Sequence, residues 1–372
     1  MCLPGLEPIC EGELAALGIK KTHAFKGGIN FTCSARQLYA ANMWLRTATR
    51  TLVRVARFDA FNWEEMTSGL DMVDWTNFVT KGRSTRLRVS SSASRLYHTG
   101  GIAERVAKHL GVKLADEADL GGDETGHQLI VIRVSHNQFT VSVDASGEAL
   151  HRRGWRQAVA KAPVRETVAA AMLMASGWQA DSPLLDPFCG SGTIAIEAAR
   201  TARGMAPGAD RAFAFQQWPS FAPGTWGSVV ADVKTTASDQ PLGVVIMGSD
   251  RDAGAIDAAR ANAERAGVAG DVTFEMRSVS DVTAGDVGSG MTRGAIVTNP
   301  PYGTRIRGGD LRNLYARFGQ ISRQQFPGWK VAMLASDTRT AGHTGFALKE
   351  SFATKAGAIN VSCLVGPVPE PA

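Results

Sequence analysis

The sequence has few cysteines, and none is spaced as a metal site or a disulfide framework requires. The five are odd in number and never form a Cys-x-x-Cys pair: Cys2, Cys10, Cys33, Cys189 and Cys363. A structural zinc site and a disulfide-stabilised secreted fold are therefore disfavoured, and we expect no metal in the protein.

The sequence also lacks any apolar run that approaches the length of a membrane span. Its first residues, MCLPGLEPICEGEL, carry acids where a signal peptide needs a basic region. We therefore expect a cytoplasmic protein without a membrane partner. Its protein partners cannot be predicted from these features.

The composition is that of an ordinary globular protein. With 44% hydrophobic and 20% charged residues, the chain can form real cores, so global disorder is excluded. The net charge of +5 permits an anionic partner without requiring one. At 372 residues, two or three domains are expected.

The first 150 residues predict an α+β module. Helical patterns cover residues 6–17 and 34–45, with Ser34 as a capping residue, and strand patterns cover 29–33 and 51–58. Two further strands, 129–134 and 139–143, are joined by a polar turn. We place domain boundaries at 1–55 and 56–150, followed by a linker and leading helix at 151–182.

A basic stretch lies inside the second of these domains. Arg86, Arg88 and Ser90 alternate with apolar residues, so a strand here has one basic and one apolar face. That face is either a solvated surface or a phosphate-binding one, and charge alone does not separate the two. The basic residues of the stretch are Lys81, Arg83, Arg86, Arg88 and Arg95.

From residue 183 to 372 the chain alternates strand and helix. This pattern predicts a parallel, doubly wound sheet, with ligands beyond the carboxyl ends of the strands. The first strand enters the turn Asp186-Pro187-Phe188-Cys189-Gly190-Ser191-Gly192-Thr193, which opens a helix. Glycines allow a tight turn, and free N–H groups at the helix start favour an anionic group.

This turn formally satisfies the dinucleotide-binding pattern, so a nicotinamide or flavin oxidoreductase must be considered. That pattern expects an acid about 20 residues further on. The better acidic candidate here is Asp250, 60 positions after Gly190 and at the end of the second strand. The spacing disfavours the oxidoreductase.

A second signal, Asn299-Pro300-Pro301-Tyr302, directly follows the apolar strand 295–298. Two prolines stiffen the loop and remove backbone donors. The Asn299 side-chain oxygen and the Pro300 carbonyl could accept hydrogens from an exocyclic amino group, while Tyr302 offers a stacking face. Amino-group methylation of a base fits this arrangement, although the loop alone could be structural.

These motifs together resemble the class I S-adenosylmethionine-dependent methyltransferases, and more narrowly the THUMP-containing RNA guanine-N2 methyltransferases. The likeness rests on DPFCGSGTIAIEAA and NPPYGTRI, and on SSSASRLYHTGGIAERV, LHRRGWR and APVRETVAAAML outside the predicted sheet domain. The family includes enzymes acting on large-subunit (23S) ribosomal RNA and relatives acting on tRNA. The segment APGADRAFAFQQW resembles the ribosomal branch.

The resemblance implies a Rossmann-like methyltransferase domain after ferredoxin-like and THUMP RNA-binding parts. It implies S-adenosyl-L-methionine as cofactor, structured RNA as partner, and rRNA more than tRNA. Catalytic roles fall on Asn299, Pro300, Pro301 and Tyr302. Cofactor-binding roles fall on Asp186, Pro187, Phe188, Cys189, Gly190, Ser191, Gly192, Thr193, Asp250, Arg251, Asp281 and Glu166. RNA-binding roles fall on Lys81, Arg83, Arg86, Arg88, Arg95 and Arg153.

Three alternatives remain open at this point. The same loop serves N6-adenine methylation of DNA or RNA, because both targets are ring-attached amines. The RNA could be tRNA rather than rRNA. A non-catalytic RNA-binding assembly factor is a further reading, which the intact motifs disfavour. Some family members carry a second methyltransferase domain, for which we expect no room before Ala372.

Overall fold

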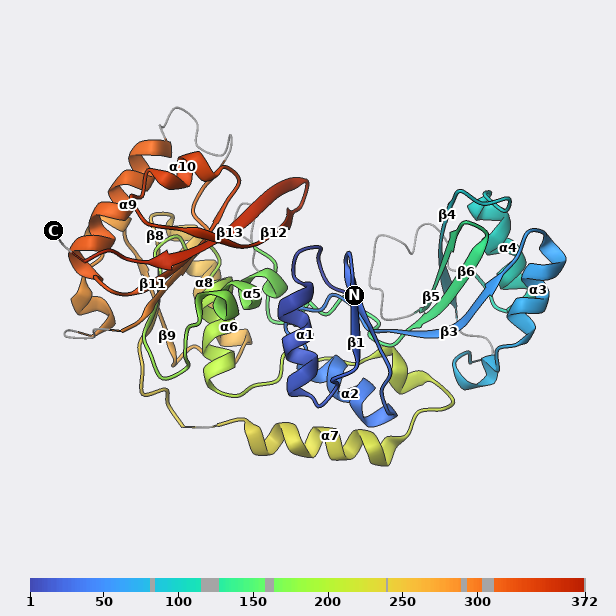
Figure 1. Ribbon diagram of the computed structural model, residues 1–372. Helices are drawn as coiled ribbons and strands as arrows, with labels where there is room; N and C mark the ends of the chain where they lie inside the picture. Colours follow the sequence, from blue (N-terminus) through green and yellow to red (C-terminus); the bar gives the residue numbers. More distant parts are fainter. Residues whose placement is uncertain are drawn as a thin grey trace.

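The computed structural model describes residues 1–80, 84–114, 127–157, 164–238, 240–288, 293–302 and 311–370. Figure 1 shows a small N-terminal unit between a four-stranded unit and a seven-stranded unit. The two larger units carry separate sheets, so residues at their surfaces can serve different functions. The predicted residues Lys81 and Arg83 lie outside the described ranges.

The N-terminal unit contains two helices and one hairpin. Helix α1 spans Glu7–Ala16, the antiparallel strands β1 and β2 span Thr22–Phe25 and Gly28–Phe31, and α2 spans Ala35–Trp44. Ser34 caps α2 through the amide of Gln37, which confirms its predicted role.

The four-stranded unit follows without a break in the backbone. Strand β3 runs through Leu52–Asp59, so the predicted boundary between residues 55 and 56 lies inside a strand. The other elements are α3 (Trp63–Asp71), β4 (Thr85–Ser92), α4 (Thr99–Leu110), β5 (Gln128–Ser135) and β6 (Gln138–Asp144). The sheet order is β3-β6-β5-β4, and only the β4–β5 pair is parallel.

The C-terminal unit is a seven-stranded sheet in the order β12-β13-β11-β10-β7-β8-β9. Its strands are β7 (Leu184–Asp186), β8 (Ile246–Asp250), β9 (Val272–Met276), β10 (Ala295–Thr298), β11 (Lys330–Ala335), β12 (Lys349–Ala356) and β13 (Ile359–Pro367). Its helices are α5 (Glu166–Ser176), α6 (Thr193–Ala202), α8 (Ala253–Arg265), α9 (Leu311–Gln325) and α10 (Thr338–Gly342). Helix α7 (Pro223–Thr236) packs instead on α2 of the N-terminal unit (Figure 1).

The predicted doubly wound architecture is confirmed, with one correction. Buried residues of α5, α6 and α8 join the core on one face of the sheet, and those of α9 and α10 join the core on the other. Strand β13, however, is antiparallel to both β11 and β12. The turn between β12 and β13 is too short for the crossover that a parallel pair needs.

Helix α5 packs on α6 and β11 rather than standing apart as a linker. Its buried face includes Val168, Ala169 and Met172, which belong to the same core as β7. The part of the predicted linker from residue 166 to 176 is therefore a structural part of the C-terminal unit.

Candidate active site

The glycine turn leads from β7 directly into α6. Gly190 and Gly192 have φ angles of 51° and 83°, a left-handed conformation that other residues adopt only with strain. A Cβ atom added to Gly192 would lie 2.7 Å from the Phe274 ring. The turn therefore needs glycine both for its backbone conformation and for its close packing on β9.

Asp250 ties the end of the second strand to this turn. Its Oδ2 accepts a hydrogen bond of 3.0 Å from the Gly190 amide, and its Oδ1 accepts one of 3.0 Å from the Asp252 amide. The carboxylate is only half-buried, and each oxygen keeps a second acceptor position. It can therefore still accept hydrogen bonds from the two hydroxyls of a ribose.

Asp186 closes β7 and is 1% exposed. Its Oδ1 accepts a hydrogen bond of 2.6 Å from the Thr298 hydroxyl and one of 3.3 Å from the Phe188 amide. Burial raises the pKa of Asp186 to about 7, the Asp250 carboxylate also raises it, and the hydrogen bonds lower it. This carboxyl group therefore changes between its protonated and its charged form near neutral pH.

The proline loop begins where β10 ends. Strands β7 and β10 are parallel neighbours, with Leu185 beside Ile296, so the glycine turn and the loop emerge at the same edge. The sheet order reverses between these two strands, which is where ligands bind in folds of this kind. The structure thus brings the two sequence motifs together.

Asn299 carries an unused acceptor at this edge. Its Oδ1 is buried and has no hydrogen-bond partner within the described part of the chain. A buried acceptor without a partner costs free energy, so this oxygen is suited to accept a hydrogen bond from a ligand that brings a donor. An amino group beside the glycine turn is such a donor.

Tyr302, the last residue of this loop, is buried. Its side chain is 3% exposed and belongs to the apolar core, so the ring does not offer an open face for stacking in this structure. The nearby Tyr315 hydroxyl donates to the Pro301 carbonyl at 3.2 Å, which fixes the loop. Stacking by Tyr302 stays a prediction.

The remaining predicted cofactor residues are spread around the turn. Pro187, Phe188, Cys189, Ser191 and Thr193 belong to the turn itself, and the Ser191 hydroxyl is buried without a partner among described residues. Arg251 is exposed directly after β8, and Asp281 is exposed at the end of a 3-10 turn, Val279–Asp281, that follows β9. The cofactor contacts of these residues stay predictions.

Glu166 is buried at the start of α5, where Arg156 donates to its Oε2 at 3.0 Å. Burial raises the pKa of Glu166 to about 7, and the Arg156 guanidinium lowers it. Its predicted contact with the cofactor stays a prediction.

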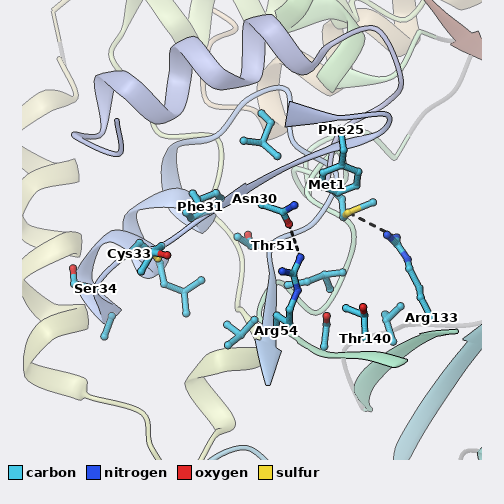
Figure 2. A pocket seen from close by; sticks show the side chains of 18 residues that line it. Met1, Phe25, Asn30, Phe31, Cys33, Ser34, Thr51, Arg54, Arg133 and Thr140 are labelled. Atoms are coloured by element: carbon cyan, nitrogen blue, oxygen red, sulfur yellow. Dashed lines mark hydrogen bonds between the residues drawn. The ribbon is translucent and has the colours of Figure 1, made fainter. Parts of the chain in front are cut away.

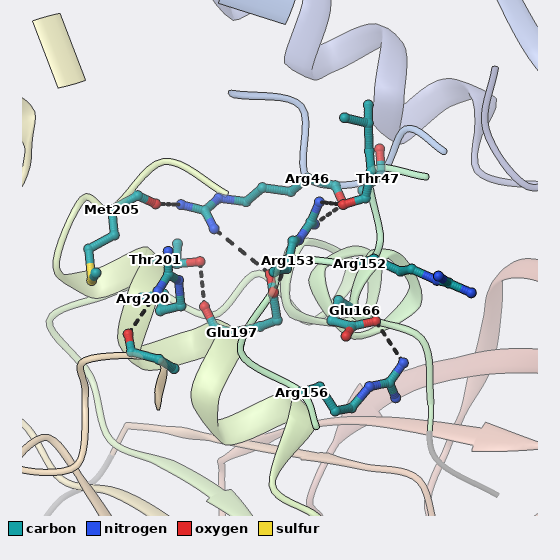
Figure 3. A network of polar contacts seen from close by, with 12 residues as sticks. Arg46, Thr47, Arg152, Arg153, Arg156, Glu166, Glu197, Arg200, Thr201 and Met205 are labelled. Atoms are coloured by element: carbon teal, nitrogen blue, oxygen red, sulfur yellow. Dashed lines mark hydrogen bonds and ion pairs between the residues drawn. The ribbon is translucent and has the colours of Figure 1, made fainter. Parts of the chain in front are cut away.

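Arg153 requires a correction, because it is 2% exposed and cannot contact RNA in this structure. Its guanidinium donates to the carbonyls of Leu150 and Arg46 at 2.5 Å each and to Glu197 Oε1 at 3.4 Å (Figure 3). A buried guanidinium has to use its donors internally. The sequence could not distinguish such a residue from an exposed arginine.

Three other predicted RNA-binding residues lie in the described ranges, and they belong to the four-stranded unit, far along the chain from this site: Arg86, Arg88 and Arg95. Arg88 and Arg95 are exposed, and Arg86 is half-buried. The structure does not bring them to the turn or to the proline loop. Of the residues that the sequence did not single out, Thr298 matters most, because its hydroxyl links the two motifs.

Two further observations concern the described residues only. None of their helices combines the length and apolarity that crossing a bilayer demands. No group of three or more histidine, cysteine, aspartate or glutamate side chains among them is arranged to hold a metal ion.

Two family profiles match this chain. One, described as an RMKL-like methyltransferase domain, covers residues 153–364. The other, described as the RlmL ferredoxin-like domain, covers residues 1–52 and so ends at the first residue of β3.

Known proteins of similar sequence and fold agree with these matches. The chain is 29% identical over 365 residues to a putative RNA methyltransferase of Synechocystis, covering 97% of this chain and 94% of that protein. It is 32% identical over 371 residues to the ribosomal RNA large subunit methyltransferase K/L of Syntrophotalea carbinolica, and this match covers 97% of this chain and 52% of that protein. The chain thus spans about half the length of that second relative.

A solved structure has the same fold over nearly the whole chain. It is SMU.472, a putative methyltransferase complexed with SAH, with a TM-score of 0.83 and 27% identity. The match covers 100% of this chain and 97% of that one.

Proposed function

Because this chain belongs to the family defined by the RMKL-like methyltransferase domain, we propose that it methylates the exocyclic N2 amino group of a guanine in structured RNA, above all 23S rRNA. The methyl donor is S-adenosyl-L-methionine. The observation that carries the choice of an amino group is the buried Oδ1 of Asn299 beside the glycine turn, which has no hydrogen-bond partner among the described residues.

The cofactor, when bound, supplies a methyl group that is attached to a positively charged sulfur. The sulfur keeps the electron pair of the bond that breaks. Asp250 accepts hydrogen bonds from the ribose, and the turn from Asp186 to Thr193 surrounds the methionine part. Asp281 is the proposed partner of the adenine amino group. These assignments use two exposed or half-buried acceptors, Asp250 at the end of β8 and Asp281 in the turn that follows β9.

Asn299 orients the target amine in this mechanism. Its Oδ1 and the Pro300 carbonyl accept the two amine hydrogens, which directs the nitrogen lone pair toward the methyl group. A new nitrogen–carbon bond forms as the sulfur–carbon bond breaks. The methylated nitrogen then releases one proton to water, so no dedicated base is needed.

RNA is favoured over DNA because the two relatives of similar sequence carry names of RNA enzymes, and because a basic four-stranded unit accompanies the catalytic one. We assign this unit as THUMP-like from the resemblance of SSSASRLYHTGGIAERV. Ribosomal RNA is favoured over tRNA by the segment APGADRAFAFQQW. A cytoplasmic location accords with that substrate.

Tritium transfer from labelled S-adenosylmethionine tests the proposal, with unmodified rRNA, unmodified tRNA and duplex DNA as acceptors. We expect N2-methylguanosine in rRNA. N6-methyladenine as the only product would replace guanine by adenine as the target. Absence of label in every acceptor, with cofactor binding intact, would favour the non-catalytic RNA-binding alternative.

Asn299→Ala tests the catalytic assignment. It should lower turnover at least about 100-fold, in the range of losing one preorganised hydrogen-bonding group, while cofactor binding persists. Asn360→Ala, an exposed asparagine on β13, is the matched control and should act like the parent. Equal turnover by the Asn299 variant would refute the role of Asn299.

A further inference from the structure

One face of the four-stranded sheet carries arginines from two edge strands and a central one. Register places Ser90, Arg133, Thr140 and Arg57 in one row across the strands. The adjacent row contains Arg88, Val131, Ser142 and Arg54. We call this surface, defined by Arg54, Arg57, Arg88 and Arg133, the basic face.

The opposite face of the same sheet is apolar and covered. Its rows include Val89, Ile132 and Val141, which belong to or pack against the core. Helix α3 packs there against Phe58, and α4 packs beside β4. Both helices thus lie on the apolar side of the sheet.

The charge of the basic face is not neutralised by the protein. All four arginines are exposed, and none forms an ion pair with a carboxylate in the described ranges. Their recorded partners are neutral: Arg54 donates to Asn30 Oδ1 at 2.6 Å, and Arg57 donates to Gln138 Oε1 at 2.7 Å. Four uncompensated guanidinium groups on one surface favour a polyanionic partner.

The basic face leads into a cavity of about 500 Å³ between the sheet and the β1–β2 hairpin. Arg54, Arg133 and Thr140 line its sheet side, and the hairpin contributes Phe25 and Phe31 to the lining (Figure 2). This volume lies in the range of about 300–1,000 Å³ that is typical of small-molecule pockets. Aromatic rings next to arginines and hydroxyls suit a planar base attached to a phosphate.

We propose that the basic face and this cavity bind an unpaired segment of the substrate RNA. Arginine guanidinium groups contact successive phosphates, and the cavity takes one unstacked base. Arg57 and Arg133 lie two strands apart, about 10 Å, so one extended strand of RNA can reach both. The proposal rests on RNA being the substrate, and it extends the RNA-binding region from β4 to β3 and β5.

An unpaired segment is favoured over a duplex because the cavity lies between two protein surfaces. Only a base that is out of a stack can enter it, and single strands expose such bases. The arginines alone would suit unpaired and duplex RNA equally, so it is the cavity that favours an unpaired segment.

Charge reversal tests the basic face. Arg54→Glu and Arg133→Glu should each weaken binding of a 12-nucleotide unpaired RNA about tenfold at low salt and reduce the salt dependence by about one unit of slope. Lys234→Glu on α7 is the control, because it makes the same charge change at an exposed position of another unit. Equal weakening by all three variants, or by none, would overturn the proposal.

Filling the cavity separates base binding from phosphate binding. Thr140→Trp should weaken binding of the unpaired RNA while leaving the salt slope unchanged. If the bulky side chain disturbs folding, Asn30→Ala is a second variant, which removes a polar group from the cavity lining instead of filling the cavity and should also weaken binding. Thermal unfolding and S-adenosylmethionine affinity should stay at the parent values. If a duplex RNA binds the parent protein as tightly as the unpaired RNA does, and the cavity variant weakens both equally, the proposal that the segment is unpaired would be contradicted.

These outcomes are distinguishable from failure of the proposed function. If the parent protein methylates no RNA but the charge-reversed variants bind RNA more weakly than the parent does, the binding surface stands and the enzymatic proposal fails. If the parent methylates RNA and the variants do so with unchanged KM, the binding surface fails alone.

Discussion

The Thr298 hydroxyl donates a hydrogen bond of 2.6 Å to the buried Asp186 carboxylate, 112 residues earlier in the chain. Thr298 ends β10 immediately before Asn299, and Asp186 ends β7 immediately before the glycine turn. This contact therefore joins the two loops that we assign to the amine and to the cofactor. Its loss should affect both the stability and the alignment of the site.

The pKa of Asp186 makes the stability of the protein pH-dependent. Burial raises that pKa to about 7, whereas an aspartate in the unfolded chain titrates near 3.8. The folded state therefore holds a proton that the unfolded state releases between these values. The resulting contribution to stability is complete below about pH 4 and is lost as the pH rises through 7, at no more than about 1.4 kcal/mol per pH unit.

Thr298→Val should enlarge this effect. The valine removes a donor to the charged carboxylate, so the pKa of Asp186 should rise further. We expect the variant to be less stable than the parent by about 1–3 kcal/mol at pH 8 and by less at pH 5. Denaturant unfolding at both pH values measures this difference. Thr298→Ser keeps the hydroxyl and should resemble the parent, and an equal deficit at both pH values for the valine would contradict the argument.

Sequence patterns predicted both loops of the site because each has a local signature. A buried strand followed by Gly190 and Gly192, or by two prolines, is visible in a few neighbouring residues. The start of helix α3 has a local signature too, Asn62 followed by Glu65, and the Asn62 side chain accepts a hydrogen bond of 2.9 Å from the Glu65 amide. Local chemistry was thus sufficient for these elements.

Long-range pairing could not be predicted in the same way. The Thr298–Asp186 hydrogen bond and the row that aligns Arg57 with Arg133 depend on strand order and register. The burial of Arg153 depends on the N-terminal unit packing against α6. No spacing within the sequence encodes these contacts, so an exposed and a buried arginine look alike there.

Glu197 should be critical for joining the N-terminal and C-terminal units. It lies one turn into α6, and its carboxylate faces the guanidinium groups of Arg153 at 3.4 Å and Arg46 at 3.9 Å, all at most 9% exposed (Figure 3). Removing one member of a buried ionic cluster leaves the others uncompensated. Glu197→Gln should therefore lower the free energy of unfolding by about 3 kcal/mol, as measured by denaturant unfolding.

An exposed ion pair between α2 and α7 provides the comparison. Arg36 on α2 and Asp232 on α7 lie 2.5 Å apart, but both side chains are more than half exposed. Solvent screens such pairs, so Asp232→Asn should change stability by less than about 1 kcal/mol although it alters the net charge equally. Similar losses for Glu197→Gln and Asp232→Asn would show that burial is not what makes Glu197 important.

Gly192 should not tolerate alanine. Its φ of 83° is strained for any side chain, and the added Cβ would lie 2.7 Å from the Phe274 ring and 3.0 Å from the Ala259 Cβ. We expect Gly192→Ala to cost about 1–2 kcal/mol in backbone strain alone and to weaken S-adenosylmethionine binding at least about tenfold, because the displaced turn carries the amides of the site.

Gly227→Ala separates this local effect from a general response to losing a glycine. Gly227 lies inside α7, and a Cβ there would meet no atom within 4 Å. Alanine favours the helix, so this variant should gain about 0.5–1 kcal/mol in stability and bind the cofactor like the parent. Isothermal titration with S-adenosylmethionine and thermal unfolding of both variants give the comparison. Parent-like cofactor affinity in Gly192→Ala would mean that the turn at Gly192 does not form the cofactor site.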